Sequence, residues 1–167
     1  MKKIIFLCMT VFMLMTSVVL AHSMPREEMY IGGVGSGCTM GYVKSIYGEP
    51  QDMRYDTLGN ILIVRYIYKN GSTYFDVVGR ALVDPEPVEA DIKVVGFSVT
   101  DKYLSTPSGF KVGSSYDQIV AKYGPGEKLV NNGETGYCYS SPNTAVDITF
   151  YVDEKNIITR IYEGTEL

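Results

Sequence analysis

Two segments of this sequence, 76 residues apart, carry the same pattern, and this repeat constrains the possible fold more than any other feature. Residues 37–48 and residues 113–124 both read G-x-[ST]-x-x-x-[VI]-x-x-x-Y-G, and a proline follows each copy within two residues. Apolar or aromatic residues recur at i, i+3 and i+7, which is typical of a helix. The hydroxyl residue near the start and the glycine at the end are helix-capping types. The sequence therefore predicts two short helices, each too short to be stable alone.

Segments rich in β-branched and aromatic residues follow each predicted helix, with turn residues between them. The predicted strands are residues 61–68, 73–78, 94–100, 136–140, 145–152 and 157–162. We therefore predict an α+β fold of two tandem units, each a short helical segment packed on an antiparallel three- to four-stranded meander. Residues 24–105 would form the first unit and residues 106–167 the second.

Residues 1–23 have the pattern of a secretory signal peptide. They open on two lysines, continue as an apolar run and end near the small residues Ala21 and Ser23. Cleavage after Ser23 or after Ala21 fits the pattern, and a retained membrane anchor is the alternative. Cys8 lies inside the apolar run rather than at a cleavage point, so we expect no lipid anchor. We predict a secreted protein, or a periplasmic or cell-envelope one, without a transmembrane segment after cleavage.

Composition excludes several kinds of function. Loss of residues 1–23 would leave 13 basic against 19 acidic residues and would remove the only histidine, His22. A chain without histidine has no Ser-His-Asp or Cys-His mechanism and no His-ligated metal site. Because the chain is acidic and lacks a basic tract, we expect no nucleic-acid partner. Acidic pairs such as Asp52 with Asp56 fit neither a glycosidase nor a calcium loop. We predict a protein that is not an enzyme and that has no cofactor or metal.

The glycine-rich segment 31–37 superficially resembles a phosphate-binding loop. It lacks the preceding strand and the lysine that such a loop requires. We therefore expect it to be a flexible lead-in to the first helix.

Two cysteines, Cys38 and Cys138, remain after the predicted cleavage. Two cysteines in an exported protein permit one disulfide. The sequence leaves open whether they form it or stay buried as thiols.

The fourteen tyrosines are the most unusual feature of the composition. Tyr66 and Tyr68 alternate along one predicted strand and Tyr137 and Tyr139 along another, so each pair shares one sheet face. This face either packs under the helices or is open to bind a partner, since tyrosine anchors protein interfaces well. The residues opposite the second pair include Cys138, a type that is usually buried. We therefore predict that the four tyrosines face outward and bind a protein.

The helix pattern and the tyrosine-containing strand after it resemble the SmpA/OmlA-type small lipoprotein of the outer-membrane β-barrel assembly machinery. Two such units in tandem resemble the β-lactamase inhibitor protein family. The resemblance covers both halves of the chain and implies helices on one face of an antiparallel sheet, in a protein that binds another protein. The lipoprotein's acylated cysteine is absent here, and no residues match an inhibitor's contact loops.

Together these observations predict an exported, non-enzymatic protein-binding module that uses an aromatic sheet face. A structural or assembly component of the cell envelope is the first alternative. A hydrolase using Asp, Glu or Tyr chemistry is the second.

Overall fold

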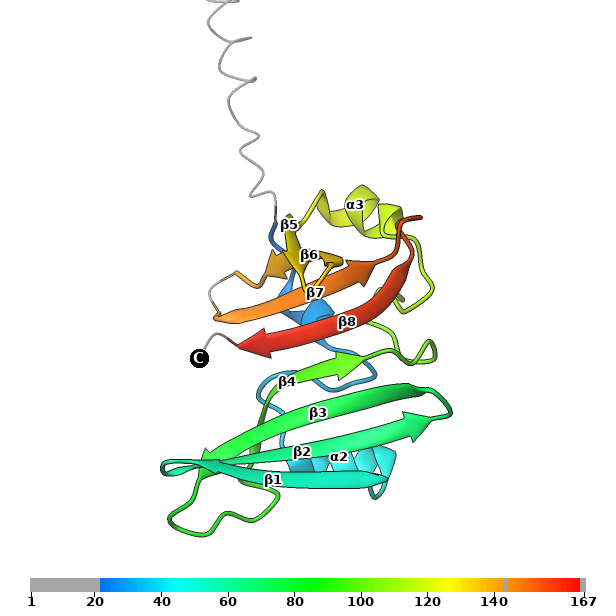
Figure 1. The fold of residues 1–167 in the computed structure, drawn as a ribbon. Helices are drawn as coiled ribbons and strands as arrows, with labels where there is room; N and C mark the ends of the chain where they lie inside the picture. The colour runs from blue at the N-terminus through cyan, green and yellow to red at the C-terminus, as the bar shows by residue number, and fades with distance from the viewer. Residues whose placement is uncertain (1–21, 143, 166–167) are drawn as a thin grey trace, which may run out of the picture.

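A computed structural model of the protein describes residues 22–142 and 144–165. Eight strands in this part form one antiparallel sheet, in the order β1-β2-β3-β4-β8-β7-β6-β5 (Figure 1). The two meanders β1–β4 and β5–β8 meet where β4 pairs with β8. The strands are β1 (Asp52–Leu58), β2 (Ile61–Asn70), β3 (Thr73–Leu82), β4 (Lys93–Val99), β5 (Glu127–Asn131), β6 (Glu134–Ser140), β7 (Val146–Val152) and β8 (Ile158–Thr165).

The prediction of two tandem helix-plus-meander units is wrong, because strands from both halves continue as a single sheet. An isolated meander would leave the backbone groups of β4 and β8 unpaired, and their pairing satisfies these groups. The edge strands β1 and β5 are absent from the predicted set. They are mostly exposed and carry charged residues, so they lack the apolar alternation by which the inner strands are recognised.

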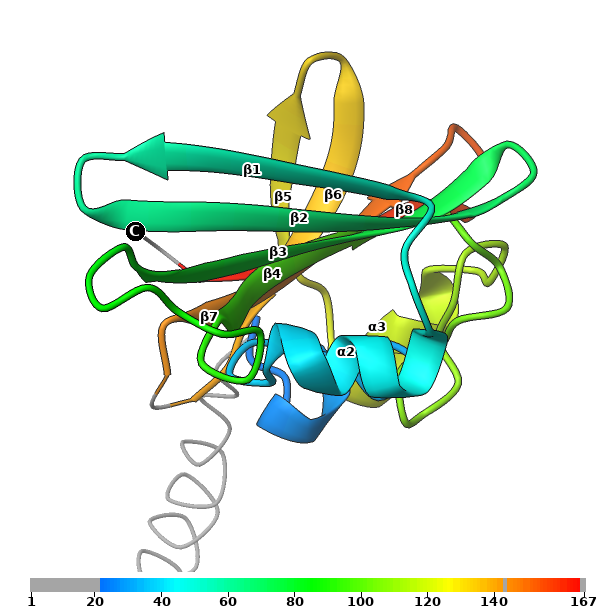
Figure 2. The ribbon, with the colours of Figure 1, turned by 90° about the horizontal axis from the view of Figure 1, so that it is seen from below.

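Short helices cover one face of this sheet only (Figure 2). They are the 3₁₀ helix η1 (Arg26–Met29) and the α-helices α2 (Met40–Tyr47) and α3 (Asp117–Tyr123). The predicted cap of α2 is confirmed, since the Tyr42 N–H donates to Thr39 Oγ1 at 3.0 Å. The predicted glycine stops are confirmed too, because Gly48 and Gly124 end the two α-helices with positive φ.

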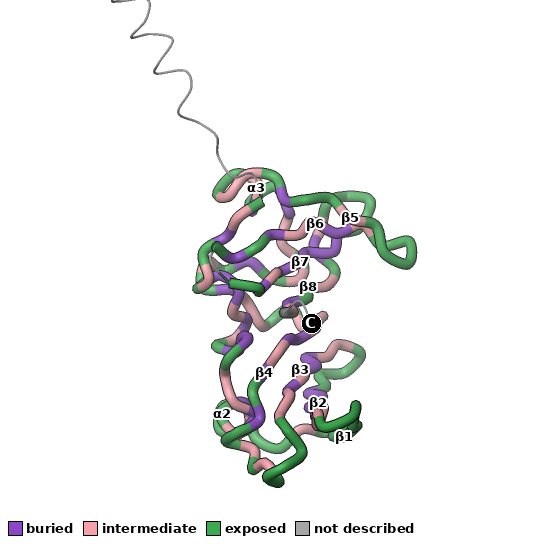
Figure 3. Tube along the Cα trace, turned by 90° about the vertical axis from the view of Figure 1, so that its left-hand side faces the viewer, coloured by how far each residue is buried: buried purple, intermediate pink, exposed green. Residues whose placement is uncertain are grey.

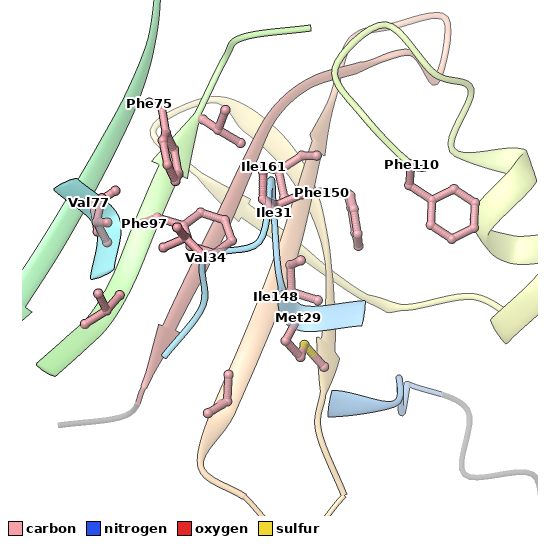
Figure 4. Close-up of a cluster of buried hydrophobic side chains, with 14 of the residues drawn as sticks. Met29, Ile31, Val34, Phe75, Val77, Phe97, Phe110, Ile148, Phe150 and Ile161 are labelled. Carbon is pink, nitrogen blue, oxygen red and sulfur yellow. The ribbon is translucent and has the colours of Figure 1, made fainter. Parts of the chain in front are cut away.

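The glycine-rich segment 31–37 is part of the core, so the prediction of a flexible lead-in is wrong. Ile31 and Val34 exchange two backbone hydrogen bonds, of 2.9 and 3.0 Å, across two glycines with positive φ. Both side chains are fully buried. Figure 4 shows them close to Phe97 of β4 and Ile161 of β8. The glycines therefore provide a tight turn that places apolar side chains under the joint between the two meanders.

The predicted signal peptide lies outside the described residues, apart from His22 and Ser23. These two residues run beside the end of β6, where the Ser140 N–H donates to the His22 carbonyl at 2.9 Å. The Met24 N–H in turn donates to the Ser140 carbonyl at 3.1 Å. In residues 22–142 and 144–165, no helix is long and apolar enough to cross a membrane.

Two strand tyrosines hold the α-helices on the sheet. The Tyr68 hydroxyl donates to the carbonyl of Gly48, which ends α2, at 3.1 Å. The Tyr139 hydroxyl donates to the carbonyl of Gly124, which ends α3, at 2.8 Å. Carbonyls at helix ends have no partner within the helix, so the tyrosine hydroxyls supply donors to groups that the helices themselves leave unpaired. Burial also raises the pKa of Tyr139 well above its usual range, which keeps this hydroxyl a donor.

The substitution Tyr139→Phe should lower the free energy of unfolding by about 1–3 kcal/mol, because the partly buried Gly124 carbonyl loses its donor and the buried Tyr116 hydroxyl loses a partner. Urea unfolding measures the change. Tyr162→Phe is the control, since the Tyr162 side chain is 45% exposed, and we expect a change within about 0.5 kcal/mol. Equal effects of the two substitutions would contradict the anchoring role of Tyr139.

Candidate functional site

The structure buries the tyrosines that the sequence predicts to bind a partner. Tyr66 and Tyr139 are fully buried, and Tyr68 is 9% exposed. Tyr137 is half-buried, and its ring stacks on that of Tyr116 with 4.0 Å between centroids. The prediction that these four residues form an open face is wrong. Burying several large rings contributes far more free energy than hiding one small thiol, so the inference drawn from a cysteine fails.

The sequence leaves open whether Cys38 and Cys138 form a disulfide, and in the structure they form none, so both residues are thiols. Cys38 packs against the core on the side of the helices. Cys138 lies between Tyr137 and Tyr139 in β6, and the alternation of a strand points its side chain to the opposite face. Because the sheet separates the two thiols, they lack the side-by-side geometry that a disulfide needs.

The acidic loop between β3 and β4 lies against the helix side of the molecule. Within it, Glu89 Oε1 accepts hydrogen bonds from the Tyr66 hydroxyl at 2.5 Å and from Lys44 Nζ at 2.9 Å. These two donors lower the pKa of Glu89. The carboxylate therefore fastens the loop to α2 and to the buried end of Tyr66.

No helix of residues 22–142 and 144–165 covers the other face of the sheet, and this open face is the candidate site. Figure 3 views the sheet from its side and shows β1 and β5 on the side away from α2, so the open face is concave. The register places Leu58, Ile61 and Leu82 in one row across β1, β2 and β3 on this face. Leu58 and Leu82 are 70% and 58% exposed. A strip of exposed apolar side chains thus extends over one end of the open face.

A hollow of about 240 Å³ lies in the open face beside the joint of β4 and β8. Gly96 lines the hollow and has no side chain to fill it, and its register partner in β8 is Gly164, over which the Tyr162 ring lies. A Cβ on Gly96 would stand 2.5 Å from the Glu163 carbonyl oxygen, which makes glycine necessary at this position. Apolar walls come from Ile63, Val78 and Tyr162.

The backbone beside the hollow is irregular. The β3–β4 register shifts between Val78 and Gly79, so that β4 carries one extra residue. Bulges of this kind recur next to binding sites, where they re-aim side chains.

Three charged residues, Arg65, Asp76 and Arg80, complete the lining of the hollow. The Arg65 guanidinium binds both carboxylate oxygens of Asp76, with 3.3 Å between Nε and Oδ1. This carboxylate raises the pKa of Arg65. Asp76 is thereby neutralised, and the charge of the half-buried Arg80 remains.

A buried carboxylate lies on the opposite face at the same joint. Glu163 of β8 is fully buried and is flanked in the register by Phe97 and Ile148. The Ser36 N–H donates to Glu163 Oε1 at 3.1 Å, and the Arg26 guanidinium donates to the Ser36 carbonyl at 3.0 Å. Burial raises the pKa of Glu163 to about 7, although the Ser36 donor and Arg26 partly oppose this shift. The carboxyl group thus ties the N-terminal segment to β8 and titrates near neutrality.

The carboxylates whose contacts are defined have structural roles. Asp153 Oδ1 accepts the N–H groups of Lys155 and Ile157, as expected for a turn. Glu134 pairs with Arg160, and that guanidinium also lies 3.7 Å from the centroid of the Tyr151 ring. No cluster of three or more His, Cys, Asp or Glu side chains that could hold a metal ion occurs in the described part of the chain.

No family model matches this chain, and no curated protein is significantly similar to it. Among solved structures, it is similar to a DUF4309 family protein, YjgB, from Bacillus subtilis subsp. subtilis strain 168, with 13% identity and a TM-score of 0.47. That similarity covers 87% of this chain and 88% of the other. It is also similar to a candidate β-lactamase inhibitor protein from Streptococcus mutans, with 14% identity, a TM-score of 0.34 and coverage of 87% and 92%.

The second of these structures is thus a candidate member of one of the two families that the sequence resembles. Neither similarity bears on the SmpA/OmlA-type lipoprotein, so that half of the resemblance stays a prediction. At these identities and TM-scores, the similarities carry no argument about what this chain binds.

The buried Glu163 predicts a specific pH dependence. Its folded pKa of about 7 lies above the ordinary value of 4.5. The folded state therefore holds the proton more tightly, and this contribution to stability is complete below pH 4.5 and is lost as the pH rises to about 7. From pH 5 to pH 8, the wild type should lose about 2–3 kcal/mol of unfolding free energy relative to Glu163→Gln. Urea unfolding of both proteins at each pH checks this, and parallel pH profiles would contradict the assignment.

Proposed function

We propose that this protein is an exported binding module, not an enzyme, and that it recognises a protein partner on the open face of its sheet. The observation that carries the proposal is that the two faces of the sheet differ in what covers them. One face is filled by the helices, the N-terminal segment and the buried tyrosines. The other is concave and uncovered, with an apolar hollow and exposed leucines. Contiguous exposed apolar surface on a folded protein often marks an interaction site.

The dimensions of the site favour a protein over a small molecule. The hollow of about 240 Å³ is smaller than the sites that enclose drug-sized ligands, which measure about 300–1,000 Å³. It can accept one side chain. The row of Leu58, Ile61 and Leu82 lies on the same face outside this hollow, so a ligand that covers both must be extended. A folded protein surface or a loop meets this requirement.

Export is the second part of the proposal, and it rests on the signal-peptide pattern of residues 1–23. The contacts of β6 support cleavage after Ala21 over cleavage after Ser23. Cleavage after Ala21 retains the hydrogen bond from Ser140 to the His22 carbonyl, whereas cleavage after Ser23 removes it.

Two tyrosines with matched exposure allow a test of the binding face. Tyr162 of the open face is 45% exposed, and Tyr42 of α2 is 46% exposed on the other side of the molecule. Against a partner isolated with the wild-type protein, Tyr162→Ala should raise Kd about tenfold or more, whereas Tyr42→Ala should leave it within about twofold. Calorimetric titration measures Kd, and thermal unfolding shows that both variants are folded. A larger loss with Tyr42→Ala, or partner binding that neither substitution changes, would contradict the open face as the site.

The mass of the exported protein tests the proposed export and the position of signal-peptide cleavage. We expect a chain that begins at His22, and intact-mass spectrometry of the protein recovered from the outside of the cytoplasmic membrane distinguishes this start from Met24. A protein that retains Met1 and sediments with membranes would contradict release by a signal peptidase.

A further inference from the structure

Two cations stand directly opposite each other on the open face. Arg80 of β3 and Lys93 of β4 are register partners, so their side chains project from the same face of the sheet. Like charges in this arrangement repel and destabilise a sheet. No ion pair or hydrogen bond links either cation to another side chain within residues 22–142 and 144–165. Among the described residues, these two adjacent cations thus form no ion pair, although the chain as a whole has a net charge of −4.

Two carboxylates of the described strands on this face, Asp56 and Asp76, form no ion pair with either cation. Ile63 of β2 is the other register partner of Arg80, and Asp56 of β1 lies beyond it. Asp56 uses Oδ1 to accept the N–H of Thr57 at 2.8 Å. The carboxylate of Asp76 is held by Arg65. The Arg80–Lys93 pair is therefore a local positive site whose repulsion an incoming anion would relieve.

This positive site borders the apolar hollow. Arg80 is half-buried and lines the hollow together with Ile63 and Val78, whereas Lys93 is exposed beside it. An apolar group in the hollow would exclude water from the guanidinium and strengthen its attraction for an anion. One ligand can thus contact the apolar hollow and the two cations at the same time.

We propose that the hollow and the Arg80–Lys93 pair form one subsite, which binds a partner segment where an apolar side chain stands next to a carboxylate. The inference rests on the proposed function and defines the chemistry of the partner at this face. The apolar side chain enters the hollow between Val78 and Tyr162 above Gly96. The neighbouring Asp or Glu carboxylate accepts hydrogen bonds from Arg80 and Lys93.

Three short peptides test this subsite on ¹⁵N-labelled full-length protein. They are acetyl-Gly-Phe-Glu-Gly-amide, its counterpart with Gln in place of Glu, and its counterpart with Ala in place of Phe. We expect the Phe-Glu peptide to shift the amide signals of Val78, Arg80 and Gly96 in a saturable titration. Each counterpart should bind at least about fivefold more weakly, because it lacks either the charge or the apolar group.

Variants of the protein supply the reciprocal test. Arg80→Gln and Lys93→Gln should each reduce binding of the Phe-Glu peptide toward that of the Phe-Gln peptide, and the difference should shrink with added salt. Lys69→Gln is the matched control, since Lys69 is an exposed lysine on the same face but outside the hollow. Within the described residues neither cation has a side-chain partner to lose, and each substitution removes the repulsion between the two cations, so the variants should unfold at the temperature of the wild type or slightly above it.

The outcomes separate this inference from the proposed function. Equal affinity for the Glu and Gln peptides, with shifts at the hollow, would overturn the carboxylate preference and leave the open face as the binding face. Shifts confined to other parts of the protein, or no shifts, would overturn the subsite. The Tyr162→Ala and Tyr42→Ala comparison with a whole partner protein would then still decide the proposed function independently.

Discussion

The filled face of the sheet depends on burial of its large apolar side chains, among them two strand tyrosines that also bind the ends of the two α-helices through hydrogen bonds to their terminal glycines. Helices of eight and seven residues are not stable alone, so they depend on contacts with the sheet. Tyr68 and Tyr139 supply both apolar surface and a donor for the carbonyls of Gly48 and Gly124. With both helices on one face, that face becomes the core and the other face stays uncovered. The open face is thus a consequence of where the tyrosines point.

The second constraint is the space at the joint of β4 and β8, which is filled on one face of the sheet and left open on the other. On the core side, the turn of residues 31–34 and the carboxyl group of Glu163 fill the space that neither α-helix covers. On the open side, Gly96 leaves a hollow, because a side chain at this position would collide with the backbone of β8. One joint therefore accounts for a buried acid on one face and a hollow on the other.

Much of the local structure could be predicted from the sequence, because local signals determine it. The repeated pattern located both α-helices and their glycine ends, and β-branched and aromatic runs located six strands. The single sheet could not be predicted, since the pairing of β4 with β8 is a long-range contact without a local signal. Alternation placed Tyr137 and Tyr139 together but could not say which face was buried. The Arg80–Lys93 pair could not be predicted from the sequence either, because only the register of β3 with β4 brings the two residues together.

The most direct test of the central claim is the exposure of tyrosine rings to a soluble gadolinium chelate, measured as paramagnetic relaxation of ring protons by NMR. The account predicts strong relaxation for Tyr162 on the open face and weak relaxation for Tyr66 and Tyr139, which are fully buried under the helices. Exposed Tyr103 provides the upper reference. Strong relaxation of Tyr66 and Tyr139, with protection of Tyr162, would mean that the helices cover the other face and would contradict the account.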